Sequence, residues 1–299
     1  MFKNILFATS ATEASDHAAR VAFNMAQIYD ANISIFHVLG VPTRGFSQIV
    51  MDVKTKEKVE IDDEYIAWVE EEIKVHYSKQ LKTAKSYNIK VRIGFPHREI
   101  LREARISAPD IIVLGGSTGN DEDSVYKKST VGSTLQRVAK AAPCPLLVVN
   151  RPAASFWGGI SKVVFGTDFS KASDAAFKFA VKLTKNRGCE LNIFHALDIS
   201  SMHMGRLLTQ DEIESQIRES LRRIRGRYID EMKEVKDYSF DVWEGLPYIE
   251  IVKYAREKHA DLIVMAHHTQ KTSNEDARLG SNIEQVIVRA GCPVISINK

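Results

Sequence analysis

The run Asp110-Ile-Ile-Val-Leu114 recurs as Asp261-Leu-Ile-Val-Met265, with residue numbers 151 higher. Each run places four apolar residues behind one aspartate. This pattern is typical of a short strand that is buried on both faces of a parallel sheet. The recurrence indicates that one folding unit occurs twice in the chain.

The repeat covers most of the chain, and its matches occur in the same order in both halves. Matched pairs are Thr9 and Thr167, Ile35-Phe36-His37 and Ile193-Phe194-His195, Gly94 and Gly245, Pro96 and Pro247, Gly132-Ser133 and Gly280-Ser281, and Cys144-Pro145 and Cys292-Pro293. This tandem duplication predicts a domain at 1–150, a linker at 151–159 punctuated by Pro152 and Gly158-Gly159, and a second domain at 160–299.

The composition is that of a globular chain and excludes several classes of protein. Hydrophobic residues make up 44% and charged residues 26% of the 299 residues, and the net charge is only +3. Such a balance predicts no nucleic-acid partner. Cys144, Cys189 and Cys292 are too few and too scattered for a disulfide framework or a zinc cluster. No apolar run is long enough for a signal peptide or a membrane span, so we expect a cytoplasmic protein without a membrane partner.

Each copy alternates short apolar runs with helical periodicity. In the first copy the expected strands are 4–8, 33–39, 90–93, 110–114 and 145–149, and the expected helices lie at 14–29 and from Pro96 onward. This alternation predicts an α/β fold with a doubly wound parallel sheet of five strands in the order 3-2-1-4-5. Ligands of such sheets bind beyond the carboxyl ends of the strands.

The two copies differ most at 41–87 and 199–238, whose roles the sequence does not reveal. Both stretches contain a charged segment with helical periodicity. Arg218, Arg222 and Arg225 share one face of the second helix, but acidic residues accompany them. A solvated helix face is favoured over a nucleic-acid site.

These residues resemble the universal stress protein family over nearly the whole of both halves. The likeness rests on Gly166-Thr167-Asp168-Phe169-Ser170, on the two Gly-x-Pro segments, on the aspartate-led strand at 261–265 and on Cys-Pro before each last strand. The resemblance implies Rossmann-like domains of the adenine nucleotide alpha hydrolase type. It also implies that the two domains pair as an intramolecular pseudo-dimer, with a further homodimer as an open alternative. ATP-binding members of the family carry a loop G-x-x-G, nine residues, then G-S or G-T.

A loop of this kind can be read from the residues of the first copy. Gly116-Ser117-Thr118-Gly119 follows an apolar strand, and Gly132-Ser133 opens a helical pattern. Glycine lets the backbone approach a phosphate closely, and the N-terminus of a helix attracts the anion with its free N–H groups. The pattern favours a phosphate site in this half.

The first copy nevertheless departs from the family loop. Twelve residues, 120–131, separate its glycine pairs, and the acidic residues 121–123 within them oppose an anion. Ser10 stands where the second copy keeps Asp168. We still expect ATP or a related nucleotide here, with Mg²⁺ or Mn²⁺. The predicted contacts, some of them implied by the resemblance, are Thr9, Ser10, Val38, Gly116, Gly119, Gly132 and Ser133.

The second copy keeps Asp168, Gly280 and Ser281 but has Ala266 and Thr269 in place of the first two glycines. A β-carbon at a left-handed position costs about 1–2 kcal/mol, so we expect no nucleotide in this half. Asp168, His267 and His268 form an alternative Zn²⁺ or Mn²⁺ site, to which His195 would add a ligand. A packing role is favoured for His195, because His37 matches it in a copy without the histidine pair.

No catalytic motif such as a nucleophile elbow or a Walker loop occurs in the chain. Cys144 and Cys292 stand next to proline ahead of strands, which favours packing over nucleophilic roles. The resemblance, together with this absence, therefore implies a stress-response regulatory module that binds its ligand without turnover. A slow ATP hydrolase or nucleotidyl transferase, and a protein-interaction module that binds no nucleotide, remain the alternatives.

Overall fold

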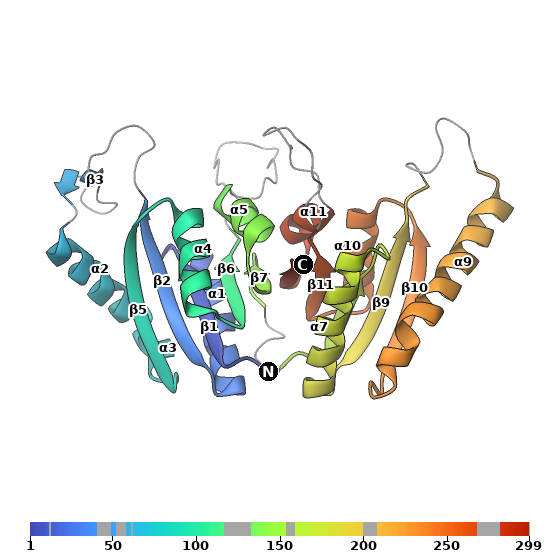
Figure 1. Cartoon of the computed structure of the whole chain (residues 1–299), viewed down its shortest axis with the longest axis horizontal. Coiled ribbons are helices and arrows are strands. Elements are labelled where there is room, and N and C mark those ends of the chain that lie inside the picture. Colours follow the sequence, from blue (N-terminus) through green and yellow to red (C-terminus); the bar gives the residue numbers. More distant parts are fainter. Residues whose placement is uncertain are drawn as a thin grey trace. The chain divides into compact units, whose positions relative to one another are not determined.

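The computed structural model describes residues 1–11, 13–40, 49–51, 58–60, 62–116, 133–153, 159–199, 208–267 and 282–298 (Figure 1). These residues divide into two compact units. The N-terminal unit comprises 2–116 and 133–146, and the C-terminal unit comprises the described residues from Leu147 onward, together with Met1. The predicted domain bounds and the predicted pseudo-dimer stay predictions.

The N-terminal unit is a parallel sheet with helices packed against it. Its elements are β1 (Asn4–Thr9), α1 (Glu13–Tyr29), β2 (Asn32–Gly40), β3 (Ile49–Met51), β4 (Lys58–Glu60), α2 (Asp63–His76), α3 (Ser78–Leu81), β5 (Ser86–Gly94), α4 (Pro96–Ser107), β6 (Ile111–Gly115) and α5 (Ser133–Ala141). Strand β7 (Leu146–Val149) begins at the boundary between the units. The strands β5, β2, β1 and β6 lie side by side in that order, and every pair is parallel.

The C-terminal unit repeats this arrangement. Its elements are β8 (Lys162–Gly166), α7 (Lys171–Arg187), β9 (Glu190–Leu197), α9 (Gln210–Tyr228), the 3₁₀ helix η1 (Ile229–Met232), β10 (Tyr238–Glu244), α10 (Pro247–Glu257), β11 (Leu262–Ala266), α11 (Asn282–Arg289) and β12 (Val294–Ile297). The strand order is β10-β9-β8-β11-β12, again all parallel. The predicted α/β class with a parallel sheet is confirmed. The short antiparallel pair β3–β4 was not predicted.

The central strands form the core of each unit. Every residue of 111–114 is buried, and so is every residue of 163–166. In the N-terminal unit α1 contacts β1 and β6, whereas α4 packs on β2, β5 and the neighbouring helix α5 (Figure 1). Burial of these apolar residues, at about 25 cal/mol per Å² removed from water, is the main force that stabilises the sheet.

The aspartate before each repeated strand binds the backbone at the start of another strand. Asp110 Oδ2 accepts hydrogen bonds from the backbone N–H groups of Lys3, at 2.6 Å, and Asn4, at 2.9 Å. Asp261 Oδ2 does the same for Ser161, at 2.7 Å, and Lys162, at 3.0 Å. Each carboxylate therefore fastens the start of the first strand of its unit to the start of the fourth, with charge-assisted hydrogen bonds.

The two Gly-x-Pro segments form the turn from the third strand of the repeat into the following helix. Gly94 and Gly245 have φ of +151° and +134°. A Cβ at these positions would lie only 3.0 Å from Glu99 Cγ and 2.8 Å from Glu250 Cγ, respectively. Glycine is therefore required for both conformation and space. The helix α4 begins at Pro96, as predicted, and α10 begins at the matching Pro247.

The three cysteines are packing residues with suppressed ionisation. Burial raises the pKa of the thiols of Cys144 and Cys292 to about 12 and that of Cys189 to about 11. The Cys189 thiol donates a hydrogen bond to the carbonyl of Ile160 at 2.8 Å. Thiols in this state are poor nucleophiles at neutral pH. Among the described residues, no helix is long and apolar enough to cross a membrane.

Candidate functional site

A short loop follows the first strand of each unit at the carboxyl edge of the sheet. We call Thr9-Ser10-Ala11 the β1 loop and Thr167-Asp168-Phe169 the β8 loop. In each loop the threonine hydroxyl accepts a hydrogen bond from the amide two residues later, at 2.8 Å from Ala11 and 3.0 Å from Phe169. These two residues have positive φ, 53° and 62°, although neither is glycine. The hydroxyl bond compensates for the strain of a left-handed conformation.

A buried tyrosine contacts each loop threonine. Thr9 Oγ1 lies 2.7 Å from Tyr77 Oη, and Thr167 Oγ1 lies 2.7 Å from Tyr228 Oη. Both tyrosines are almost fully buried. Burial raises the pKa of Tyr77 to about 12 and also raises that of Tyr228, so both phenols keep their protons at neutral pH.

A histidine near the carboxyl end of the second strand contacts the backbone of each loop. His37 Nδ1 lies 2.8 Å from the carbonyl of Thr9, and His195 Nδ1 lies 2.8 Å from the carbonyl of Thr167. Burial lowers the pKa of both imidazoles, which favours the neutral form. Because a carbonyl only accepts, Nδ1 carries the proton and Nε2 is a hydrogen-bond acceptor.

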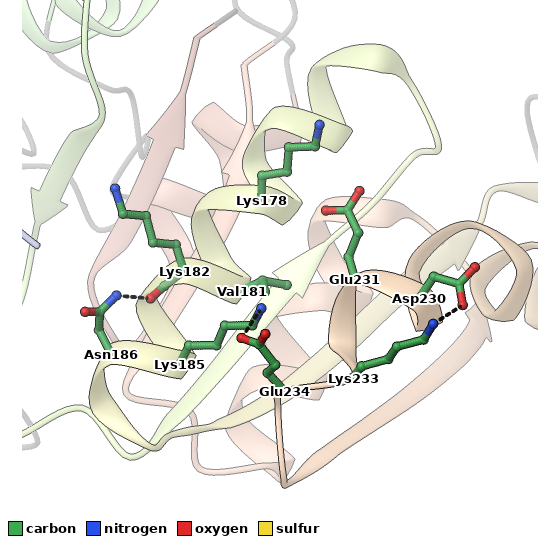
Figure 2. Close-up of a pocket in the computed structure, with 9 residues that line it drawn as sticks. All are labelled: Lys178, Val181, Lys182, Lys185, Asn186, Asp230, Glu231, Lys233 and Glu234. Atoms are coloured by element: carbon green, nitrogen blue, oxygen red, sulfur yellow. Dashed lines mark hydrogen bonds and ion pairs between the residues drawn. The ribbon is translucent and has the colours of Figure 1, made fainter.

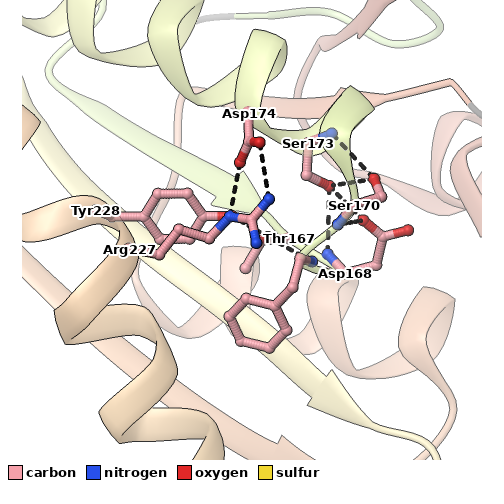
Figure 3. Close-up of polar contacts among 8 residues, drawn as sticks. Thr167, Asp168, Ser170, Ser173, Asp174, Arg227 and Tyr228 are labelled. Atoms are coloured by element: carbon pink, nitrogen blue, oxygen red, sulfur yellow. Dashed lines mark hydrogen bonds and ion pairs between the residues drawn. The ribbon is translucent and has the colours of Figure 1, made fainter.

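An acidic residue near the start of the next helix pairs with a basic residue. Asp16 Oδ1 lies 2.9 Å from His76 Nε2 in the N-terminal unit. In the C-terminal unit Asp174 accepts two hydrogen bonds from Arg227, at 2.8 Å from Nε and 2.7 Å from Nη2 (Figure 3). The hydrogen bond from Arg227 lowers the pKa of Asp174. Each basic residue stands directly before the tyrosine of its unit, although the two copies otherwise differ most in these stretches.

The two loops differ at their middle residue. Ser10 is exposed, and its hydroxyl lies 2.7 Å from Ser15 Oγ. Asp168 instead accepts hydrogen bonds through Oδ1 from the amide of Ser170, at 3.0 Å, and from the hydroxyl of Ser173 (Figure 3). The aspartate therefore braces the start of α7, whereas the exposed serine hydroxyl borders solvent.

The third loop residue differs more in size. Phe169 is 6% exposed, and its ring centroid lies 4.5 Å from that of His195. The guanidinium carbon of Arg223 lies 4.4 Å from the centre of the same ring, a cation–π contact. The matching residue of the β1 loop is Ala11, whose methyl group provides no such ring.

The strand register corrects how the sequence aligned the glycine loops. Ala8 pairs with Leu114 on β6, and Gly166 pairs with Met265 on β11. One residue further along each strand, Gly115 therefore corresponds to Ala266, and Gly116 corresponds to His267 and not to Ala266. His267 is 4% exposed, and its amide donates to the carbonyl of Ile297 at 2.9 Å.

The structure describes four of the seven predicted nucleotide contacts with their surroundings. Thr9, the last residue of β1, pairs with His37 on β2, so Ser10 lies next to Val38, which is near the carboxyl end of β2. Gly116 follows β6, the other neighbour of β1. Ser133 begins α5, but its side chain is outside the described residues, as are Gly119, Gly132, Thr269, Gly280, Ser281 and the acidic residues 121–123.

The alternative metal site can be followed only in part. Asp168 and His267 are described, whereas His268 is not. Within the described ranges, no group of three or more histidine, cysteine, aspartate or glutamate side chains could hold a metal ion. Asp168 instead uses its carboxylate in the β8 loop.

A pocket of about 470 Å³ lies elsewhere, between α7 and η1 (Figure 2). Its lining comprises Lys178, Val181, Lys182, Lys185, Asn186, Asp230, Glu231, Lys233 and Glu234. Lys185 pairs with Glu234 at 3.0 Å, and Lys233 pairs with Asp230 at 3.6 Å. The first pair crosses the pocket and the second lies on one side of it. Because the pocket lies on the C-terminal half of α7, away from the β8 loop, it is not the predicted site.

The chain has two α/β units, each with a parallel sheet and with a loop that begins with threonine at the carboxyl edge of that sheet. This arrangement defines a tandem protein of the Rossmann-like class. The sequence model of the universal stress protein family matches residues 1–150 and 159–298. The chain therefore belongs to the universal stress protein family, in two tandem copies.

Individual relatives support this assignment. Universal stress protein MJ0531 of Methanocaldococcus jannaschii is 34% identical over 143 residues, which are 46% of this chain and 82% of that protein. Universal stress protein MJ0577 of the same organism is 27% identical over 154 residues, 46% of this chain and 94% of that protein. The crystal structure of a universal stress protein from Archaeoglobus fulgidus DSM 4304 is 20% identical and shares the fold, with a TM-score of 0.70 over 99% of this chain and 98% of that chain.

Proposed function

We propose that this tandem universal stress protein is a regulatory module that binds ATP or a related adenine nucleotide in its N-terminal unit. The observation that carries the proposal is the convergence of Thr9-Ser10, Val38 and Gly116 on the ends of the neighbouring strands β1, β2 and β6. The carboxyl edge of such a sheet is where parallel α/β folds bind ligands.

The chemistry of these residues fits a nucleoside. Thr9 and Ser10 supply hydroxyl groups that can bond to ribose or to a ring nitrogen. Val38 is half-buried and supplies an apolar surface for a base. His37 Nε2, the acceptor nitrogen of the neutral ring, suits a hydroxyl or an amino group as partner.

The phosphates would lie between the end of β6 and the start of α5. Gly115 and Gly116 carry no side chains that could block the backbone amides. The helix α5 begins at Ser133, and its free N–H groups and partial positive charge attract an anion. Mg²⁺ or Mn²⁺ would accompany a triphosphate and neutralise part of its charge.

The C-terminal unit lacks these features, which supports a structural role for it. His267 stands at the position of Gly116, and Phe169 with Arg223 occupies the carboxyl edge beside His195. His267 and Phe169 thus place large side chains where the N-terminal unit has only Gly116 and Ala11.

Calorimetry with ATP and Mg²⁺ tests the proposal, with Gly119→Val as the variant and Gly280→Val, a glycine substitution in the second copy, as the control. We expect binding heat for the wild type at one site per chain, loss of that heat in Gly119→Val and no change in Gly280→Val. An absence of heat in the wild type, or loss of heat only in Gly280→Val, would contradict the proposal. Release of labelled phosphate in the same samples would indicate the ATP hydrolase instead.

A further inference from the structure

We propose that the pairs His76-Tyr77 and Arg227-Tyr228 are positioning residues that fix the β1 loop and the β8 loop. We infer further that His76-Tyr77 thereby sets the nucleotide affinity of the N-terminal unit. The second part rests on the proposed function, whereas the first part does not.

Each pair stands at the end of a helix in the stretches where the repeat is otherwise lost. His76 ends α2 and Tyr77 follows it, and Arg227-Tyr228 ends α9. The phenol contacts the loop threonine, while the basic residue contacts an aspartate in the helix that follows the loop. In both units the tyrosine thus holds the first residue of the loop, and the basic residue holds the helix that follows the loop.

The direction of the hydroxyl contact follows from what each atom must satisfy. Within the described part of the chain, Tyr77 Oη has Thr9 Oγ1 as its hydrogen-bond partner, and a buried phenol proton without an acceptor is costly. The phenol therefore donates to Thr9 Oγ1, which also accepts from the amide of Ala11. The proton of the Thr9 hydroxyl then remains as a donor at the carboxyl edge, where the nucleotide is proposed to bind.

The tyrosine rings are held independently of their hydroxyl groups. The Tyr77 ring packs against Phe7, at 5.7 Å between centroids, and against Phe23, at 6.0 Å. The Tyr228 ring packs against Phe177 at 4.3 Å and Phe165 at 5.8 Å. Tyr→Phe in either unit therefore removes the hydroxyl bond and leaves the aromatic packing in place.

The basic anchors differ in strength. Arg227 makes two parallel hydrogen bonds to Asp174, whereas His76 makes one to Asp16. A bidentate guanidinium pair fixes orientation better than a single contact. By this contact the β1 loop is therefore held less firmly than the β8 loop.

The experiment compares Tyr77→Phe with its matched control Tyr228→Phe in the full chain. Amide hydrogen exchange at Ala11 and Phe169 reports on the loops, and calorimetry with ATP and Mg²⁺ reports on binding. We expect Tyr77→Phe to speed exchange at Ala11 and to weaken ATP binding, each about three- to tenfold, the equivalent of one hydrogen bond. Tyr228→Phe should speed exchange at Phe169 alone and leave ATP affinity within about twofold of the wild type.

The possible results separate the two parts. If exchange at Ala11 and Phe169 is unchanged in both variants, the positioning role is wrong whether or not ATP binds. If exchange responds but the two variants have equal ATP affinity, the link to the nucleotide is wrong. If the wild type binds no ATP while exchange at Ala11 still responds, the proposed function and its link to Tyr77 fail and the positioning role stands.

A second variant tests the basic residue without weakening the fold. His76→Arg copies Arg227 and should add a second hydrogen bond to Asp16, so exchange at Ala11 should slow about threefold or more. Unchanged or faster exchange at Ala11 would remove His76 from the positioning pair.

Discussion

Lys90 Nζ lies 2.7 Å from Glu103 Oε1, and the glutamate side chain is only 7% exposed. The matching residues of the C-terminal unit are Asp241 and Tyr254, where the phenol donates to Asp241 Oδ2 at 2.6 Å. Strand β5 contacts α4 through the first pair, and β10 contacts α10 through the second. The contact is thus made by an ion pair in one unit, and in the other by a phenol and a carboxylate that also pairs with Lys258 at 3.5 Å.

Replacing Lys90 with methionine should destabilise the protein, because the buried Glu103 carboxylate would lose its partner. We expect a loss of about 1–3 kcal/mol in the free energy of unfolding, measured by urea denaturation. The exposed pair Lys85–Asp30 provides the control, and Lys85→Met should cost less than about 0.5 kcal/mol. The double variant Lys90→Asp with Glu103→Tyr, which copies the C-terminal unit, should recover most of the loss. A double variant less stable than Lys90→Met would contradict this account.

The two strand-leading aspartates should differ in their contribution to stability. Asp261 is 8% exposed and accepts from two amides and the Ser161 hydroxyl, whereas Asp110 is exposed and accepts from two amides. We expect Asp261→Ala to cost about 2–4 kcal/mol and Asp110→Ala about 1–2 kcal/mol, because unpaired buried amides are expensive. Thermal denaturation of the two variants checks the order, and equal costs would argue against a role for burial.

Glycine substitutions should have opposite effects at two positions. Gly245→Ala introduces a Cβ 2.8 Å from Glu250 Cγ at a φ of +134°, so we expect a loss of at least about 1 kcal/mol. Gly226 lies inside α9 with open space around its Cα. There alanine should stabilise by about 0.5–1 kcal/mol, since helix propensity improves. Chemical denaturation measures both, and a stabilised Gly245→Ala variant would refute the steric argument.

Because the cysteine thiols are buried, we expect the stability of the protein to fall as the pH rises in the alkaline range. Burial raises the pKa of the folded Cys144 and Cys292 thiols to about 12, whereas a free thiol ionises near pH 8.5. The folded state therefore holds protons that the unfolded chain releases. This contribution to stability is complete below about pH 8.5 and is lost as the pH rises toward 12, by at most about 1.4 kcal/mol per pH unit for each thiol.

Urea denaturation under reducing conditions at pH 7.5, 8.5 and 9.5 measures this effect. A variant with all three cysteines replaced by alanine should show a smaller loss of stability between pH 8.5 and 9.5. Identical pH profiles for the variant and the wild type would show that the thiols ionise as easily in the folded protein as in the unfolded chain.

The repeat was enough to predict the α/β class and the parallel sheet, because buried strands and helix starts leave local patterns. Asp110 and Pro96 carry such patterns: the structure shows Asp110 bonded to the backbone at the start of β1 and Pro96 as the first residue of α4. The topology of the sheet was also enough to predict that Thr9, Val38 and Gly116 lie at its carboxyl edge. Their role as nucleotide contacts stays a prediction.

Contacts between distant segments could not be predicted in this way. Tyr77 and Tyr228 lie in stretches without recognisable repetition, and a single Tyr after a basic residue is no signal until the fold brings it to the threonine. His76-Tyr77 and Arg227-Tyr228 do lie 151 residues apart, the offset of the repeated strand, but their surroundings differ too much for this recurrence to be noticed without the structure. The sequence alignment matched Gly116 with Ala266 by residue type, which is one residue away from His267, the position that the strand pairing gives.

The bond between Asp110 and the amide of Lys3 spans 107 residues. During synthesis on a ribosome, β1 therefore leaves the exit tunnel long before β6, which pairs with it in the folded sheet. Closing so long a loop costs entropy that is recovered only when the partner arrives, which makes pairing of the first and fourth strands a late event. Until then the apolar first strand of each newly made unit has one unpaired edge, and such an edge is prone to pair with another chain.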